Sequence, residues 1–360
     1  MGEDYGYANA RIRAMKSRLL DARAYDDLLA AASLDQIIEL LSDTAYKAEI
    51  EAALVKYGGI QCVSEALRTS LSHTIGRIKS FFSARSRELV GILLARWDIF
   101  NVVAILRGQA RGVSAAEILD TLVPVGELTE FELREMAQQP AVRATADLML
   151  AWHLPYARIL AEALRGHRYG DLSDVETHLQ QLRYREALAG LGDEENDLLV
   201  REMLQAEIDV ANLGTLLRLC RLGDRAAKLQ ARYGAADATG LLIKGGGLPW
   251  RVLKELSVAR EMESIVSGLG EGPYARLLGS RMEAYRQSGE IAVLERGLEE
   301  FLVLKGVGMF HRDPLSIAIP IGYIWAKSNE VTNLRLIAHG KAFGLGRDEI
   351  RQEFIWWVRE

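Results

Sequence analysis

The stretch WDIFNV at residues 97–102 recurs twice along the chain, as IDVANL at 208–213 and as NEVTNL at 329–334. The shared pattern is an acid, two variable residues, an asparagine and an aliphatic residue. Each copy has a basic residue nine positions after the acid and a glycine fourteen positions after it. The acids are Asp98, Asp209 and Glu330, followed by Asn101, Asn212 and Asn333, by Arg107, Arg218 and His339, and by Gly112, Gly223 and Gly344. This spacing predicts an internally repeated fold.

The repeat extends upstream of each acid. A glutamate precedes the acid by 33 to 35 residues, and a tyrosine precedes that glutamate by 19 to 21 residues. The glutamates are Glu65, Glu176 and Glu295, and the tyrosines are Tyr46, Tyr156 and Tyr274. Gly126-x-Leu128 and Gly246-x-Leu248 mark where the second and third copies begin. We therefore expect three helical domains, each of ordinary domain size, at residues 1–118, 119–238 and 239–360.

The composition favours an all-α fold. Only 7 prolines interrupt 360 residues that are rich in Ala, Leu, Glu and Arg, side chains that lose little rotamer freedom in a helix. The segment before Gly112 places Leu94, Asp98, Asn101 and Ile105 on one helical stripe, and the glycine suits a left-handed cap. In the third copy, Pro320 fits the first turn of a helix that we expect over residues 321–343. Each copy is therefore interpreted as a small helical bundle.

The repeated polar residues have a structural interpretation and a chemical one. The acid and the asparagine share one helix face, whereas the basic residue is rotated by about half a turn and cannot pair with the acid on the same helix. We expect the acid and the asparagine to face inward and to find partners, such as the tyrosine, within their own bundle. The alternative is an all-α enzyme in which Asp98, Asp209 and Glu330 bind a metal. One active site is rarely needed three times, so the structural interpretation is favoured.

Charge and cysteine content exclude several classes of protein. The net charge is −5, from 44 Lys plus Arg and 49 Asp plus Glu, which gives no overall basic field for nucleic-acid binding. The two cysteines cannot form a disulfide framework, and the longest apolar stretches are shorter than a membrane span. No phosphate-binding loop or zinc spacing is present, so we expect no cofactor and no metal. These features indicate a cytoplasmic protein.

The first helix combines cations with an apolar stripe. Its basic residues include Arg11, Arg13 and Lys16, interspersed with Ile12 and Met15. Such a helix presents a charged face to solvent or to an acidic partner or membrane surface. We treat these three cations as candidate partner-binding residues.

Several segments resemble a known family. They are Glu295 to Leu298, PIGYIWAK at 320–327, EVTNLR at 330–335, Gly340-Lys341, Gly344-Leu345, and YANARIRAM at 7–15. Together with the two earlier Asp-x-x-Asn helices, they resemble the C subunit of the A/V-type rotary ATPases, whose eukaryotic relative is the V-type d subunit. The departures are Glu330 in place of aspartate, His339 in place of arginine, and Glu65, which lacks the leucine four residues on.

The resemblance implies three similar helical domains arranged as a pseudo-threefold funnel. It further implies a rotor subunit without catalytic activity of its own, peripheral to the membrane, which couples the central shaft to the membrane ring of proteolipid subunits. Ion transport is thereby linked to ATP hydrolysis or synthesis. A helical adaptor unrelated to the rotor is the main alternative, although solenoid adaptors usually repeat every 20 to 50 residues or so.

Overall fold

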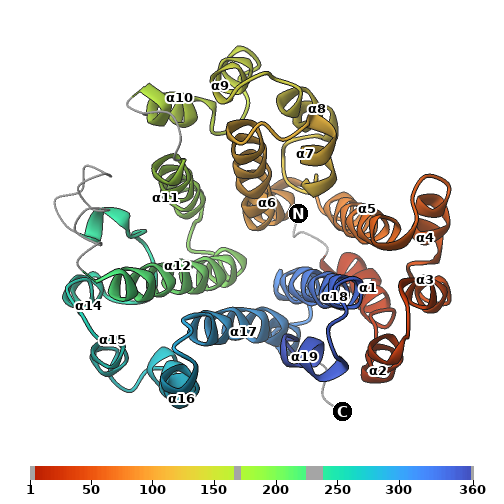
Figure 1. The fold of residues 1–360 in the computed structure, drawn as a ribbon. Helices are drawn as coiled ribbons and strands as arrows, with labels where there is room; N and C mark the ends of the chain where they lie inside the picture. Colours follow the sequence, from red (N-terminus) through yellow and green to blue (C-terminus); the bar gives the residue numbers. More distant parts are fainter. Residues whose placement is uncertain (1–4, 166–171, 224–237, 358–360) are drawn as a thin grey trace. The chain divides into compact units, whose positions relative to one another are not determined.

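The computed structural model describes residues 5–165, 172–223 and 238–357. Within these ranges the chain is helical and contains no strand, which confirms the all-α fold (Figure 1). Its contacts divide the chain into two compact units. The terminal unit joins Met1–Pro140 to Gly306–Glu360, and the middle unit is Ala141–Lys305. The division into three repeats at residues 1–118, 119–238 and 239–360 stays a prediction.

The terminal unit contains helices from both ends of the sequence. They are α1 (Tyr5–Lys16), α2 (Ala22–Ala30), α3 (Leu34–Ser42), α4 (Lys47–Leu54), α5 (Gly59–Ser80), α6 (Ala84–Ala110), α7 (Ala115–Thr121), α8 (Glu130–Ala137), the 3-10 helix η2 (Met309–His311), α18 (Ala318–Ala342) and α19 (Arg347–Gln352). Side-chain caps define the starts of the short helices. Ser114 and Thr129 form capping boxes with the glutamates three residues later, and these satisfy backbone N–H groups that the first turn leaves unpaired.

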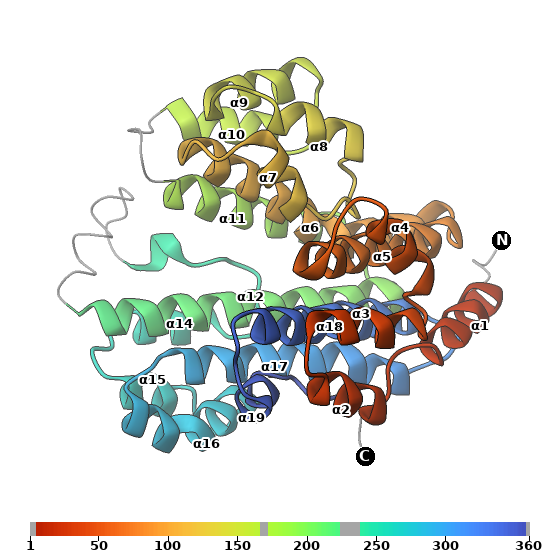
Figure 2. The same cartoon turned by 45° about the vertical axis from the view of Figure 1, so that its right-hand side comes forward.

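Helix α18 is the core of the terminal unit. It packs most extensively against α5 and also against α1 and α3, so the C-terminal helix joins the N-terminal helices (Figures 1 and 2). It starts three residues before the predicted 321 and ends at Ala342, one residue before the predicted end. Pro320 lies in its first turn, as expected, where the missing N–H group costs no hydrogen bond.

Helix α6 packs on the two short helices that follow it, α7 and α8. Its length and apolar composition would by themselves suit a membrane span, but 61% of its apolar window is buried inside the protein. Asp98 and Asn101 are also fully buried on this helix. Burial of this kind is typical of a core helix in a folded domain.

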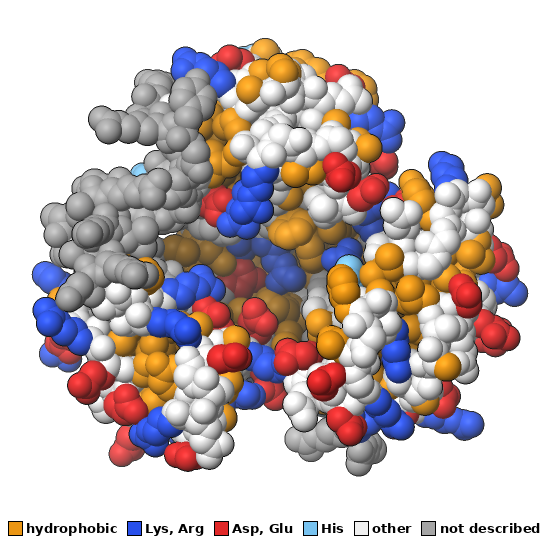
Figure 3. All heavy atoms as spheres, in the orientation of Figure 1, with side chains coloured by type: hydrophobic (Ala, Val, Ile, Leu, Met, Phe, Trp, Pro, Cys, Tyr) orange, Lys and Arg blue, Asp and Glu red, His pale blue; other side chains and the backbone are white. Residues whose placement is uncertain are grey.

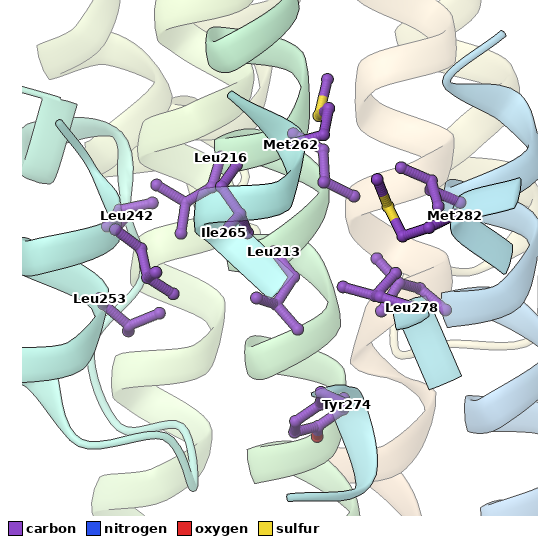
Figure 4. Close-up of a cluster of buried hydrophobic side chains, with 13 residues drawn as sticks. Leu213, Leu216, Leu242, Leu253, Met262, Ile265, Tyr274, Leu278 and Met282 are labelled. Atoms are coloured by element: carbon purple, nitrogen blue, oxygen red, sulfur yellow. The ribbon is translucent and has the colours of Figure 1, made fainter. Parts of the chain in front are cut away.

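The middle unit follows the same plan of long helices with short ones packed on them. It contains α9 (Val142–Ala151), α10 (Ala157–Arg165), α11 (Ser173–Ala189), α12 (Glu195–Leu222), the 3-10 helix η1 (Ala238–Leu241), α14 (Trp250–Leu256), α15 (Met262–Gly268), α16 (Pro273–Ser288) and α17 (Ala292–Gly308), whose last three residues belong to the terminal unit. Figure 4 shows how Leu213 and Leu216 of α12 meet Leu253, Ile265 and Leu278 from the short helices that follow. These apolar contacts fix α12 against the next part of the chain.

Candidate functional site

The first acid–asparagine pair, on α6, binds the loop between α7 and α8. Backbone N–H groups of Glu127 and Leu128 donate to the two oxygens of Asp98, at 2.9 and 3.0 Å. Asn101 makes a two-way contact with Val123: its Nδ2 donates to the Val123 carbonyl and its Oδ1 accepts from the Val123 N–H, both at 2.8 Å. The Asp98 and Asn101 side chains thus provide hydrogen-bond partners for backbone groups of this loop, which lie outside any helix or strand.

The second pair, on α12, binds the segment before α14 in the same way. The Leu248 N–H donates to Asp209 Oδ1 at 2.9 Å, and the Tyr274 hydroxyl donates to Asp209 Oδ2 at 3.2 Å. Asn212 repeats the two-way contact, here with the carbonyl and N–H of Ile243, at 2.8 and 2.7 Å. The repeated sequence pattern therefore corresponds to a repeated hydrogen-bond pattern.

The third acid, Glu330 on α18, binds the N-terminal part of the chain. The Leu20 N–H donates to Glu330 Oε2 at 2.6 Å, and the Tyr46 hydroxyl donates to Oε1 at 2.7 Å. Lys327 Nζ donates to the same Oε1 and to the Tyr46 hydroxyl, both at 2.8 Å, and lies 4.0 Å from the Tyr46 ring centre. All three side chains are at least 95% buried. The third cluster therefore contains a buried ion pair that the sequence pattern did not indicate.

The asparagine of the third copy holds the C-terminal tail. Asn333 Nδ2 donates to the Ile355 carbonyl at 3.2 Å, and Asn329 Nδ2 donates to the same oxygen at 2.9 Å. Among the described residues, Asn333 Oδ1 has no hydrogen-bond partner. Asn333 therefore donates to a backbone carbonyl, as Asn101 and Asn212 do, but accepts no backbone N–H group. Tyr25 packs on Phe354 and Trp356 beside this contact, with ring centres 5.6 and 5.7 Å apart.

With the predicted repeat boundaries, the clusters link successive repeats, so the acids do not find their partners within their own bundle as expected. Asp98 binds residues of the second copy and Asp209 binds Tyr274 of the third. Glu330 then binds Tyr46 of the first copy. The long helix that ends one predicted repeat is held by loop backbone of the next repeat and, for Asp209 and Glu330, by a tyrosine at a helix start. In terms of the predicted repeats, the terminal unit contains a link from the first copy to the second and one from the third copy to the first, and the middle unit contains a link from the second copy to the third.

Two glycines of the repeat lie so close to the buried aspartates that a larger residue would not fit. A Cβ atom on Gly126 would overlap the Asp98 carboxylate, and one on Gly246 would overlap that of Asp209. The equivalent position before Leu20 is Arg18, which has a side chain, and there the acid is glutamate. The extra methylene of Glu330 lets the carboxylate reach the Leu20 N–H from farther away. The longer acid therefore accompanies a position that carries a side chain instead of glycine.

Burial dominates the electrostatics of these clusters. It raises the pKa of Asp98, while N–H donation by Glu127 and Leu128 opposes the rise. Burial likewise raises the pKa of Asp209, opposed by donation from Leu248 and from the Tyr274 hydroxyl. Because the oxygens already accept protein hydrogen bonds, the acids are arranged as anchors for backbone and tyrosine donors. The geometry gives no support to their alternative role as metal ligands.

The Tyr46 phenol should make stability fall at alkaline pH. Burial, then the charge and hydrogen bond of Glu330, raise the pKa of Tyr46 well above 10.0. In the unfolded chain the phenol ionises near pH 10, so its contribution is complete below that pH and is lost as pH rises further. We expect Tyr46→Phe to reduce the pH slope of the free energy of unfolding above pH 10 by up to about 1.4 kcal/mol per pH unit.

Urea unfolding between pH 8 and 11 measures this slope, and Tyr7→Phe is the control. The Tyr7 side chain is 62% exposed, so Tyr7→Phe removes a tyrosine hydroxyl outside the buried cluster. An unchanged slope in Tyr46→Phe would contradict the assignment.

The other repeated residues occupy equivalent positions with different partners. Arg218 on α12 pairs with Glu295 on α17 at 2.5 Å. Glu65 on α5 instead forms a two-bond ion pair with Arg68 on its own helix, at 2.9 and 2.7 Å. Arg68, followed by the Thr69 hydroxyl and the charge of Lys56, lowers the pKa of Glu65 against the opposing effect of burial. His339 stacks on Phe343. Arg107 is exposed in the last turn of α6, and Glu176 lies half-buried on α11.

The glycines and tyrosines lie at the ends of helices. Gly112, Gly223 and Gly344 all have positive φ, at 68°, 53° and 72°, which explains why glycine suits these positions after the long helices. The ψ of Gly223 is −127°, so this residue does not form the left-handed cap that its sequence position predicts. The tyrosines lie at helix starts: Tyr46 precedes α4, Tyr156 precedes α10 with a φ of 65°, and Tyr274 is the second residue of α16.

The cations of α1 divide into two kinds. Arg11 lies 4.3 Å from the Phe81 ring centre and also donates to the Tyr7 hydroxyl, and Lys16 lies 4.0 Å from the Phe310 ring centre. Arg13 is exposed. Two of the three candidate partner-binding cations therefore also hold α1 against neighbouring rings. On the face drawn in Figure 3, basic and acidic side chains are spread over the surface together.

A further buried charge cluster escaped the sequence analysis. Arg183 on α11 donates to Glu207 on α12 at 2.6 Å, and the Tyr184 hydroxyl donates to the same oxygen at 3.1 Å. Both charged side chains are more than 90% buried. Neither residue belongs to the repeat, and no local spacing connects them. Over the described ranges, no group of three His, Cys, Asp or Glu side chains is placed to hold a metal.

Comparison with known proteins identifies the family. The model of the ATP synthase (C/AC39) subunit family matches residues 8–353. The chain belongs to this family. It is thus related to the C and d subunits of the A/V-type ATPases, which confirms the resemblance seen in its sequence.

Archaeal relatives match over nearly the whole chain. The C subunit of the A-type ATP synthase of Methanocaldococcus jannaschii is 29% identical over 98% of this chain and 86% of its own length. That of Methanosarcina acetivorans is 27% identical over 98% and 93%, and that of Haloquadratum walsbyi is 26% identical over 98% and 99%. These three relatives therefore match 98% of the chain.

Proposed function

We propose that the chain is a non-catalytic rotor subunit of an A/V-type rotary ATPase, in which it couples the central shaft to the membrane proteolipid ring. Membership of the ATP synthase (C/AC39) subunit family supports a place in this complex. The matching relatives are named as C subunits of A-type ATP synthases. The proposal places the chain at the cytoplasmic side of the membrane, held there by protein contacts.

The contact of the last acid helix with the N-terminal part of the chain is the structural observation that best supports a coupling role. A part that transmits torque must resist being pulled open, and an open array of repeats frays from its ends. Here the last acid helix binds Leu20 and Tyr46 of the first copy, so neither end of the repeat series is left without a neighbour. These links combine buried hydrogen bonds with close packing. Both resist displacement, so we expect the links to be stiff.

The acids of the repeat favour this role over an enzymatic one. Asp98 and Asp209 accept backbone N–H groups, and Glu330 accepts from Lys327 and Tyr46. A metal or a substrate would have to displace these donors from buried positions. We therefore propose that the chain catalyses no step itself and that ATP chemistry and ion movement take place on other subunits.

Affinity purification from native membranes tests the proposal. We expect a tagged chain, extracted in mild detergent, to carry with it shaft subunits and the proteolipid ring in an ATP-hydrolysing assembly. Mass spectrometry of the retained proteins gives the answer. Recovery of the chain alone, or with unrelated soluble proteins, would overturn the proposal and favour a helical adaptor.

The cations of α1 are proposed to contribute to these contacts. Arg13 is the residue of choice for a test, because Arg11 and Lys16 also hold aromatic rings of the same unit. In the same purification, Arg13→Glu is expected to reduce the recovered partners, with an unchanged melting temperature as the control. Full recovery of all partners would remove Arg13 from the contact.

A further inference from the structure

Helix α19 packs on α18 as α7 packs on α6. In both pairs an isoleucine of the short helix lies against a glycine of the long helix, ten residues earlier in the chain. A Cβ atom on Gly108 would lie 2.5 Å from Cγ1 of Ile118, and one on Gly340 would lie 2.5 Å from Cγ1 of Ile350. In the first turn of both short helices, a glutamate accepts from the backbone N–H group before the helix. Helix α19 is therefore the counterpart of α7.

The tail after α19 corresponds to the segment that joins α7 to α8. The Val123 carbonyl accepts from Asn101 and the Ile355 carbonyl accepts from Asn333, in each case across 22 residues of chain. Beyond Val123 the same segment continues to the N–H groups that bind the acid of α6. In the third copy the backbone N–H group that binds the acid is that of Leu20. Two separate segments of the chain thus meet where the first copy has one continuous segment.

Side chains join these two segments. Asp26 on α2 accepts from both Arg347 and Arg351 on α19, and the two helices lie side by side (Figure 2). The ring of Tyr25, also on α2, packs on Phe354 of the tail. The Asp26 side chain is 43% exposed, so its ion pairs are partly screened by water. The contact is therefore reversible, whereas α7 is joined to α8 by the chain itself.

The element on the C-terminal side of this contact has few buried side chains. We call residues 347–357 the C-terminal clasp. Its buried side chains are Ile350 and Phe354, and residues 342–349, which connect it to α18 and form its first turn, are exposed. Asn333 Oδ1 has no hydrogen-bond partner in the described part of the chain, although both of its counterparts accept a backbone N–H group. A small buried area and incomplete pairing are typical of an element that opens without global unfolding.

We propose that the C-terminal clasp detaches from α18 and α2 as one unit while the rest of the terminal unit stays folded. Detachment uncovers Tyr25, Asn329 and Asn333, whose side chains contact the tail in the closed state. Helix α7 cannot detach in this way, because the chain continues from it into α8 and both ends of the segment are held. The proposal concerns the chain by itself and does not depend on the rotor function.

Two matched substitutions test the clasp from the side of the long helices. In Gly340→Ala the new methyl group overlaps Ile350. We expect hydrogen exchange of the clasp's hydrogen-bonded amides, at residues 350, 353 and 354, to become at least about 10-fold faster in the full chain. The melting temperature should stay within about 2 °C of the wild type, because only the clasp opens.

Gly108→Ala is the matched variant of the first copy. Its methyl group overlaps Ile118 in the same way, but detachment cannot relieve the overlap. We therefore expect its melting temperature to fall by about 3–8 °C. Unchanged exchange of the clasp in Gly340→Ala would overturn the proposal. A loss of melting temperature in Gly340→Ala as large as that in Gly108→Ala would also overturn it.

Substitution of Asp26 tests the same clasp from the side of α2. Asp26→Asn removes the charge that binds both arginines of α19, so exchange of the same amides should become about 3–10-fold faster. Asp27→Asn is the control, because Asp27 is the next residue of α2 and is exposed, and it should leave the exchange unchanged. Opening as one unit requires equal changes at Ile350 and Phe354. A change at Phe354 alone would show fraying from the end and would overturn the proposal, as would clasp exchange that occurs only with global unfolding.

Discussion

Replacing Glu330 with alanine is expected to lower the free energy of unfolding by about 3–5 kcal/mol, the cost of leaving a buried charge unpaired. Glu330 is 1% exposed and accepts from the Leu20 N–H, the Tyr46 hydroxyl and Lys327. Its removal leaves the Lys327 ammonium, itself 4% exposed, without a counter-ion and frees the N-terminal loop from α18. Urea unfolding at pH 7 measures the loss.

Two further variants make this prediction specific to the buried pair. In Glu330→Ala/Lys327→Met the orphaned ammonium is gone, so the double variant should be more stable than Glu330→Ala alone. Glu295→Ala breaks the more exposed pair with Arg218 and should cost no more than about 1 kcal/mol. Equal losses in Glu330→Ala and Glu295→Ala would contradict the special role of the third cluster.

Gly126→Ala is expected to destabilise the protein by about 2–4 kcal/mol, through overpacking and the loss of buried hydrogen bonds. The added methyl group would overlap the Asp98 carboxylate, which must then move away from the N–H groups of Glu127 and Leu128. Thermal and urea unfolding of the purified chain measure the effect.

Gly76 offers a control of opposite sign for this prediction. It lies within α5, and a Cβ atom there would meet nothing within 4 Å. Gly76→Ala should therefore stabilise the protein by about 0.5–1 kcal/mol, because alanine loses less backbone entropy in a helix. A second test combines Gly126→Ala with Asp98→Ala. The methyl group then no longer overlaps a carboxylate, so the double variant should lose less free energy of unfolding than the sum of the two single variants. Full additivity would show that the methyl group and the carboxylate do not meet.

The sequence was sufficient to predict the class of the fold and the polar positions on which it depends. Helix-favouring composition and glycine stops predicted an all-α chain, and the left-handed φ values of Gly112, Gly223 and Gly344 follow from their place after long helices. Inward-facing acids were expected as well, since three copies of one pattern must satisfy one local geometry. Local spacing was enough for these inferences because each depends on a single helix.

The partners of the acids could not be predicted in this way. A spacing along the chain does not state whether Tyr46 meets the acid of its own copy or that of another, and it meets Glu330, which lies 284 residues away. The ion pair of Lys327 could not be predicted either. Lys327 lies in the apolar segment PIGYIWAK, and its partner Glu330 follows one helical turn later. The pair Arg183 and Glu207 joins two helices without any repeated pattern. Such contacts depend on tertiary packing.

The position of α18 has a consequence for how the chain is made on the ribosome. Helix α5 ends at Ser80, whereas its main packing partner begins at Ala318. At about 5–20 residues per second, the N-terminal helices are synthesised roughly 12–48 s before the helix that completes their core. During that time Tyr46 and the apolar side of α5 lack their native cover. The nascent chain therefore exposes this apolar surface until α18 emerges, and truncation after residue 317 would remove the helix on which α1, α3 and α5 pack.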